Sequence, residues 1–282
     1  MFLSKEVNEI AIRFEGKHIK RGSDTLIVVF QGAFTKFNEE YANKIVAGTV
    51  SPESIQDTHT YYHFHKLSEQ ITQLDFFFIE DYYSQLYGWY MFDHGELIIR
   101  SFNDKLSQFI CKHNYKEVVL IGSSKGGVGS TLYGLINPYV TKVFGMVPDL
   151  RISTAPYGES GRKLFFNNDA NFEKKVKDFQ GLLSSYPVTV ENKKFYFYTG
   201  MRDYGFQQLV ELNKYLYRKY GYDSHLIIMP TPDSHGPLIK EHANLINHII
   251  HDVINDIPLE NELFLELGGN IYLSTYPAIG KK

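Results

Sequence analysis

The chain has 282 residues, of which 43% are hydrophobic and 22% are charged, and its formal net charge is −3. This composition excludes a disordered chain, and the lack of a basic excess argues against nucleic acid as a partner. No apolar run approaches the roughly 18 residues that span a bilayer, and the N-terminal stretch is too charged for a signal peptide. The single cysteine, Cys111, excludes an internal disulfide and a multi-cysteine metal site. We therefore expect a soluble, cytoplasmic protein.

Short apolar runs alternate with amphipathic helical patterns along most of the chain. Strands are predicted at residues 25–30, 75–79, 117–121, 142–147, 194–198 and 225–229. Helices are predicted at residues 96–113, 206–220 and 238–254. Because the strand runs are apolar on both faces, they favour a mostly parallel sheet covered by helices on both sides. An antiparallel hairpin is expected within residues 7–21, before the first of these strands.

Residues 151–192 interrupt the alternation of strands and helices. The stretch is polar and rich in turn residues, with a helical pattern at residues 172–183. A connection of this length between two strands is unusual, and such connections often act as lids. We therefore predict one domain over residues 1–282, with a lid insertion at residues 151–192.

A nucleophile motif follows the strand at residues 117–121. Residues 122–126 read GSSKG, which matches G-x-S-x-G with Ser124 at its centre. A tight turn from strand to helix would hold this serine in a strained conformation with its hydroxyl accessible. Gly126, Gly127 and Gly129 are costly in an ordinary helix, so they indicate a helix start that lies close to the sheet. The helix itself is expected at residues 130–136.

A serine nucleophile needs a histidine base, and an acid must hold that histidine in one tautomer. Asp203 follows the strand at residues 194–198, and His235 follows the strand at residues 225–229. Both therefore stand just past later strands, in the order serine, acid, histidine that this arrangement requires. Asp149, which also follows a strand, is the alternative acid.

An oxyanion hole requires two backbone N–H donors. The amide of Lys125, directly after the nucleophile, is one expected donor. The amide of Ala33, in the loop after the first parallel strand, is the other, with Phe34 as the neighbouring alternative. The charged side chain of Lys125 is expected either to meet an anionic substrate or to be solvated.

Aromatic residues make up 15% of the chain, and because they are spread along it, a large core explains most of them. Phe34, Tyr82, Trp89 and Tyr90 are candidates for lining the substrate pocket, and core packing is the alternative for the last three. Three nearby histidines, His59, His63 and His65, have a spacing that fits neither a helix face nor a strand face completely. No metal site is predicted from them.

The segment from Leu120 to Gly129, LIGSSKGGVG, resembles the nucleophile segment of bacterial capsular polysaccharide O-acetyltransferases of the meningococcal serogroup A type, within the α/β-hydrolase superfamily. The Ser-Lys-Gly-Gly sequence also resembles the acetyltransferase component of accessory Sec systems. The likeness extends loosely along most of the chain, but only this segment is close. It implies an α/β-hydrolase fold, with Ser124 as nucleophile, Asp203 as acid and His235 as base.

The resemblance further implies acetyl-CoA as the acyl donor and a polysaccharide hydroxyl as the acceptor, without a metal. The expected reaction is ping-pong acetyl transfer through an acetyl-serine. Because the same residues would also serve ester hydrolysis, a carboxylesterase or carbohydrate esterase is the first alternative. A non-catalytic interaction protein of the same fold is the second. An oligomer is compatible with all three readings.

Overall fold

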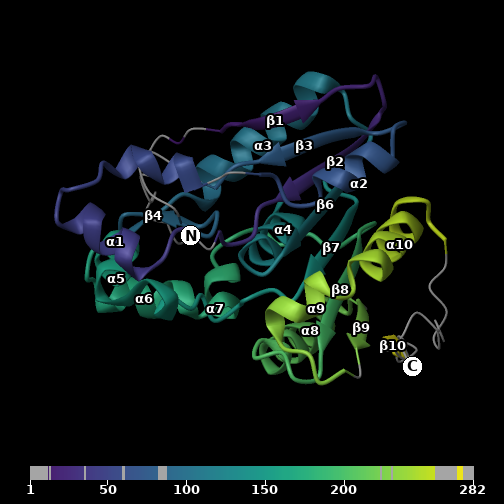
Figure 1. Cartoon of the computed structure of the whole chain (residues 1–282). Helices are drawn as coiled ribbons and strands as arrows, with labels where there is room; N and C mark the ends of the chain where they lie inside the picture. The colour runs from purple at the N-terminus through teal and green to yellow at the C-terminus, as the bar shows by residue number, and fades with distance from the viewer. Residues whose placement is uncertain are drawn as a thin grey trace, which may run out of the picture.

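A twisted sheet of eight strands forms the centre of the computed structural model (Figure 1). The structure describes residues 12, 14–34, 36–58, 61–81, 88–222, 224–229 and 231–257, and the backbone of residues 272–275. In spatial order, the strands are β1 (Gly16–Ile19), β3 (Asp75–Ile79), β2 (Thr25–Phe30), β6 (Glu117–Ser123), β7 (Lys142–Met146), β8 (Lys194–Gly200), β9 (His225–Met229) and β10 (Tyr272–Thr275). The six inner strands are parallel, whereas β1 and β10 pair antiparallel at the two edges.

The six parallel strands are those that the sequence predicts, and helices cover both of their faces. Alternate residues of each strand enter opposite cores: Val28 and Phe30 face one, and Ile27 and Val29 face the other. The first core is closed by α1 (Glu39–Val46), α3 (Ile99–His113), α4 (Lys125–Ile136) and α8 (Phe206–Tyr220). The second is closed by α2 (His65–Gln70), α9 (His235–Lys240) and α10 (Ala243–Ile254). This two-sided burial explains the continuous apolar runs.

The order of the strands reverses between β2 and β6. From β2 the chain moves outward to β3 and then returns to β6 on the opposite side of β2. In open parallel sheets, ligands bind at the carboxyl ends of the strands beside such a switch point. Gln31 directly follows β2 and Ser124 directly follows β6, so both lie at the edge where a ligand is expected.

The insertion at residues 151–192 is mostly helical. It contains a short 3-10 turn, η2 (Ala155–Tyr157), followed by α5 (Gly158–Phe166), α6 (Ala170–Lys177) and α7 (Phe179–Leu183). Helix α5 lies beside α1 on one flank of the molecule (Figure 1). Aromatic rings join the insertion to the loop that precedes α1, with Tyr157 and Phe165 packed against Phe37. The role of residues 151–192 as a lid stays a prediction.

Several elements differ from the expectations. Strand β1 pairs with β3, and the first half of the expected hairpin lies largely outside the described residues. The helix expected at residues 130–136 begins at Lys125, and the pattern at residues 238–254 is divided into α9 and α10 around residues 241–242. The elements not predicted are α1, η1 (Pro52–Thr58), α2, β4 (Phe92–Asp93), β5 (Glu96–Leu97), η2, α5 and β10. Most are too short for a periodic pattern to develop.

No helix within the described ranges is both long and apolar enough to cross a membrane.

Candidate active site

Ser124 occupies the tight turn between β6 and α4. Its backbone has φ 54° and ψ −118°, a conformation that residues other than glycine rarely adopt. Its amide donates a hydrogen bond to the carbonyl oxygen of Met146 at 2.9 Å, and its carbonyl accepts one from the amide of Val128 at 3.1 Å. Strain of this kind persists only where the surroundings hold it, and it is concentrated at functional sites.

Two glycines beside Ser124 allow α4 to start against the sheet. A Cβ on Gly126 would lie 2.3 Å from the carbonyl oxygen of Phe30, and a Cβ on Gly122 would lie 2.2 Å from that of Gly126. These separations are far below any tolerable contact, so neither position accepts a side chain. The glycine-rich sequence is therefore explained by close backbone approach, as the sequence indicates.

His235 is the first residue of α9 and lies next to Ser124. The hydroxyl of Ser124 is 2.7 Å from His235 Nε2, a distance at which it can donate a hydrogen bond to that nitrogen. The helix is fixed to the sheet because the hydroxyl of Tyr198 donates to the carbonyl oxygen of Leu238 at 3.1 Å. The base expected from the sequence therefore reaches the expected nucleophile.

Asp203 lies on the opposite side of the imidazole. His235 Nδ1 is 2.6 Å from Asp203 Oδ2, and the carboxylate is fully buried. The second carboxylate oxygen accepts a hydrogen bond from the amide of Gly205 at 2.6 Å. A buried carboxylate on Nδ1 selects the tautomer whose Nε2 can accept a proton from the serine. The structure thus brings all three residues together in one hydrogen-bonded series.

Asp149, the alternative acid, lies near the same site without joining that series. Its amide donates to the carbonyl oxygen of Ser124 at 3.4 Å, and its Oδ2 accepts from the amide of Ser153 at 3.3 Å. Burial raises the pKa of the Asp149 carboxyl, an effect that the nearby His235 partly opposes. The acid that hydrogen-bonds His235 in this structure is Asp203.

The loop after β2 passes close to Ser123 and carries the amides considered for an oxyanion hole. The Gln31 amide donates to the hydroxyl of Tyr90 at 2.6 Å, and the Gly32 amide donates to His63 Nδ1 at 2.9 Å. The following residue, Ala33, is exposed, and no acceptor for its amide is found in the described part of the chain. The backbone amides of Ala33 and Lys125 therefore remain the candidate donors. Phe34, the alternative to Ala33, is buried.

The side chain of Lys125 neither faces solvent nor stands open to a substrate, which corrects both expectations. Its Nζ lies 2.7 Å from Asp81 Oδ2, and the two side chains are 1% and 0% exposed. Burial lowers the pKa of Lys125 to about 8, although the carboxylate of Asp81 opposes this shift. The sequence could not show this pair because Asp81 follows a different strand.

His63 braces the loop after β2, a role that the sequence did not reveal. Besides accepting from the Gly32 amide, it donates from its own amide to Gln31 Oε1 at 2.8 Å. Its ring stacks on Phe34 with the centroids 5.0 Å apart. Burial, together with the nearby charge of Lys125, lowers the pKa of His63 to about 4. His63 is therefore held neutral as a hydrogen-bond acceptor.

The other histidines considered for a metal site are placed differently. His65 lies 2.7 Å from Lys17 Nζ, and His59 lies outside the described residues. Within the described part of the chain, no group of three or more His, Cys, Asp or Glu residues could hold a metal ion.

Trp89 and Tyr90 pack in the hydrophobic core and do not line a pocket. Trp89 and Tyr90 are 3% and 0% exposed and belong to the core, which is the alternative that the sequence left open. Tyr90 acts on the site indirectly, because its hydroxyl accepts from the Gln31 amide and its own amide donates to Asp81 Oδ1 at 2.9 Å. Tyr82 lies outside the described residues.

Tyr204 is an aromatic residue at the site that the sequence did not single out. The ring of Tyr204 stacks on the imidazole of His235, with centroids 4.3 Å apart and an interplanar angle of 19°. The available signal was its position directly after Asp203. The stack adds a second constraint on the orientation of the imidazole.

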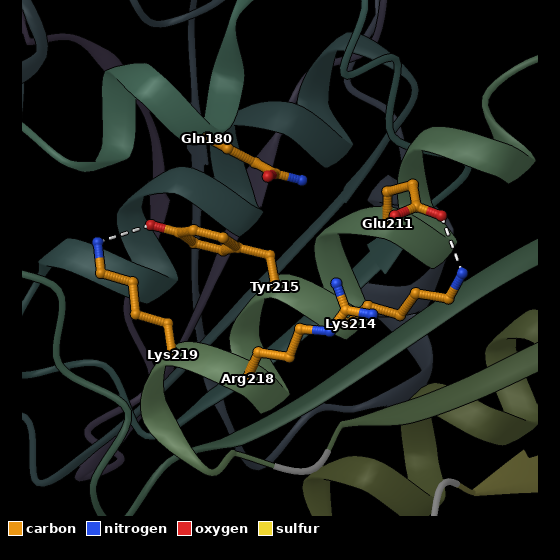
Figure 2. A pocket seen from close by; sticks show the side chains of 6 residues that line it. All are labelled: Gln180, Glu211, Lys214, Tyr215, Arg218 and Lys219. Carbon is orange, nitrogen blue, oxygen red and sulfur yellow. Dashed lines mark hydrogen bonds and ion pairs between the residues drawn. The ribbon is translucent and has the colours of Figure 1, made fainter.

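A separate surface cavity of about 290 Å³ lies between α7 and α8 (Figure 2). Its lining residues are Gln180, Glu211, Lys214, Tyr215, Arg218 and Lys219. Within it, Lys214 pairs with Glu211 at 2.9 Å, and Lys219 donates to the hydroxyl of Tyr215 at 2.9 Å. It includes none of the triad residues and offers no nucleophile with an adjacent base, so it is not the candidate active site.

Comparisons with known proteins support the fold. No protein-family model matches the chain, and no curated protein matches it in sequence. Among solved structures, α/β-hydrolase domain-containing protein 10 from mouse is similar, with a TM-score of 0.53 and 14% identity over 91% of this chain and 98% of that one. The capsule O-acetyltransferase of Neisseria meningitidis serogroup A has a TM-score of 0.53 and 18% identity over 87% of this chain and 93% of that one.

A third similar structure is the glycosylation-associated protein (Gap123) complex from Streptococcus agalactiae, with a TM-score of 0.55 and 14% identity. It is matched over 82% of this chain, which spans only 42% of the length of that chain. At these identities the likenesses show the fold alone. The chain has an α/β fold of the α/β-hydrolase type, with a mostly parallel sheet, as the sequence predicts.

Proposed function

We propose that the chain is a serine-dependent acyltransferase that moves an acetyl group from acetyl-CoA to a hydroxyl of a bacterial polysaccharide such as a capsule. The observation that carries the proposal is the hydrogen-bonded series from Asp203 through His235 to a strained Ser124. This arrangement suits acyl transfer because it supplies an activated nucleophile, a base and an orienting acid in contact. The similarity to a capsule O-acetyltransferase supports the choice of acetyl group and acceptor.

The first half of the reaction would acylate the enzyme. Ser124 Oγ attacks the thioester carbonyl while His235 Nε2 takes the hydroxyl proton, and Asp203 stabilises the resulting imidazolium. The negative charge on the carbonyl oxygen would rest on the amides of Lys125 and Ala33. As the carbon–sulfur bond breaks, His235 returns the proton to the CoA thiolate, which leaves an acetyl ester on Ser124.

The second half would transfer the acetyl group. His235 removes the proton from a sugar hydroxyl, whose oxygen attacks the acetyl-serine carbonyl. Collapse of the tetrahedral intermediate releases the acetylated sugar, and the proton returns to Ser124 Oγ. In an esterase, water would take the place of the sugar hydroxyl and the same residues would perform the same steps.

Free-thiol release from acetyl-CoA, measured with and without a panel of capsule polysaccharides, tests this proposal. Because the exposed thiol of Cys111 would react with a thiol reagent, the assay uses the Cys111→Ser background. We expect release that a polysaccharide stimulates and that Ser124→Ala abolishes. Release without stimulation, together with cleavage of a simple aryl acetate through Ser124, would indicate an esterase. A Ser124 that does not react with a fluorophosphonate probe would indicate a non-catalytic protein.

A further inference from the structure

A cation lies one aromatic ring away from the imidazole of His235. The guanidinium of Arg151 is 4.2 Å from the centre of the Tyr204 ring, and that ring stacks on His235 at 4.3 Å. The Tyr204 ring therefore contacts both the guanidinium of Arg151 and the imidazole of His235.

The segment that carries Arg151 is held in an unusual conformation. Val147 and Ile152, on either side of it, have φ values of 38° and 51°, which are rare for β-branched residues. The amide of Val147 donates to the carbonyl oxygen of Tyr198 at 2.7 Å, and the amide of Ile152 donates to that of Asp149 at 3.0 Å. These bonds keep the strained segment, and with it Arg151, at the carboxyl edge of the sheet.

The charge of Arg151 is only partly compensated by its surroundings. The carboxylate that pairs with it, Asp149, has its Oδ1 3.8 Å from Arg151 Nε, which is beyond hydrogen-bond length. Burial also raises the pKa of Asp149, which disfavours its charged form. The Arg151 side chain is 43% exposed, so a ligand can reach it from solvent.

Exposed apolar side chains lie on loops next to the candidate active site. Five large hydrophobic residues are exposed in the described part of the chain, and three of them, Tyr61, Met201 and Tyr204, are next to the site. Tyr61 packs edge-on against Phe34 beside the candidate oxyanion loop, while Met201 and Tyr204 flank Asp203. Exposed apolar surface concentrated at one place marks a binding surface more than chance placement does.

We propose that Arg151, positioned on Tyr204, forms a subsite for an anionic group, a phosphate or a carboxylate, of the substrate that reacts at Ser124. The proposal rests on the proposed function, because it takes Ser124 as the nucleophile. A guanidinium offers a planar set of donors that matches both anions, and stacking on an aromatic ring orients it before the ligand arrives. The anion belongs either to the acyl donor or to the acceptor, and the experiment distinguishes these sources.

Two acetate esters of similar shape test the subsite, the neutral phenyl acetate and the anionic 4-acetoxybenzoate. The readout is the ratio of kcat/KM for the anionic ester to that for the neutral one, so that any effect common to both cancels. We expect Arg151→Gln to lower this ratio about three- to tenfold and Arg151→Glu to lower it further. Arg151→Lys should lie between, since it keeps the charge and loses the planar donors. Arg218→Gln, on α8, is the matched control and should leave the ratio unchanged.

The donor is examined with acetyl-CoA and the neutral thioester S-acetyl-N-acetylcysteamine. If Arg151→Gln raises KM for acetyl-CoA more than for the neutral thioester, the anion belongs to the donor. If only the aryl ratio changes, it belongs to the acceptor, because in a ping-pong reaction the acceptor hydroxyl enters the position that the aryl leaving group vacates. Equal ratios in wild type and Arg151→Gln for both pairs would overturn the subsite. Ester cleavage that survives Ser124→Ala would instead overturn the proposed function, so the two failures are separable.

Discussion

Lys125 Nζ lies 2.7 Å from Asp81 Oδ2, and this buried pair connects the residue after the nucleophile to the segment that follows β3. The second oxygen of Asp81 accepts from the amide of Tyr90, whose hydroxyl in turn accepts from the amide of Gln31. The two backbone segments expected to form the oxyanion hole are therefore joined through one buried polar network. Such networks are costly to leave half-satisfied.

Lys125→Met should be strongly destabilising, because it leaves the Asp81 carboxylate buried without its cation. Removing one partner of a buried pair typically costs about 3–5 kcal/mol. The double variant Lys125→Met/Asp81→Leu should recover much of this loss, since it removes both charges. Urea unfolding of the wild type, both single variants and the double variant measures the effect. A Lys125→Met protein as stable as the wild type would contradict the role of the pair.

Asp203→Asn should reduce kcat for aryl acetate cleavage by roughly 10³- to 10⁴-fold, because an amide no longer holds His235 in the tautomer that accepts the serine proton. Asp149→Asn is the matched control, since Asp149 is also buried near the site but makes no hydrogen bond to His235. Its effect on kcat should be much smaller. A greater loss in Asp149→Asn than in Asp203→Asn would reverse the assignment of the acid.

Gly126→Ala should destabilise the fold by at least about 1–3 kcal/mol, because its Cβ would meet the carbonyl oxygen of Phe30 at 2.3 Å. Gly236→Ala provides the comparison, since a Cβ there meets nothing within 4 Å and the residue lies inside α9. Alanine should be neutral or slightly stabilising at that helical position. Thermal unfolding of both variants gives the answer, and equal stabilities would show that α4 does not need its close contact with β2.

His63 should make stability fall as the pH is lowered from about 6.5 to about 4. Its folded pKa is lowered to about 4, whereas the unfolded chain takes up the proton near the ordinary value of 6.5. The unfolded state therefore binds more protons in this window, and the loss is at most about 3 kcal/mol. Urea unfolding at several pH values should show a shallower dependence in His63→Gln. The exposed His248→Gln on α10 is the control, and an identical slope in His63→Gln and the wild type would exclude this contribution.

The sequence predicts the central strands well, because a strand that is buried on both faces is a continuous apolar run in the sequence. Each inner strand is a short apolar run, and each ends next to a turn residue or a charged residue that reaches the functional edge. The G-x-S-x-G motif and that chain order predict the nucleophile and the histidine, and they favour Asp203 as the acid with Asp149 as the alternative. Short elements such as α1 and α2 carry no comparable periodic signal, and their buried residues pack into cores that distant segments form.

The contacts that refine the site join segments far apart in the chain. Lys125 meets Asp81, His63 accepts from Gly32, and Arg151 stacks on Tyr204. A local sequence pattern cannot predict these contacts, because each one depends on how two loops meet at the edge of the sheet. A lysine after the nucleophile reads as a surface residue until its partner carboxylate is placed beside it.

Peptide mapping by mass spectrometry after brief mixing with acetyl-CoA and an acid quench tests the central claim most directly. We predict one added acetyl group on the peptide that contains Ser124, absent from Ser124→Ala and from His235→Ala. Thiol release from acetyl-CoA with no acetyl group on Ser124 at any mixing time, or with acetylation only at Cys111, would contradict an acetyl-serine mechanism.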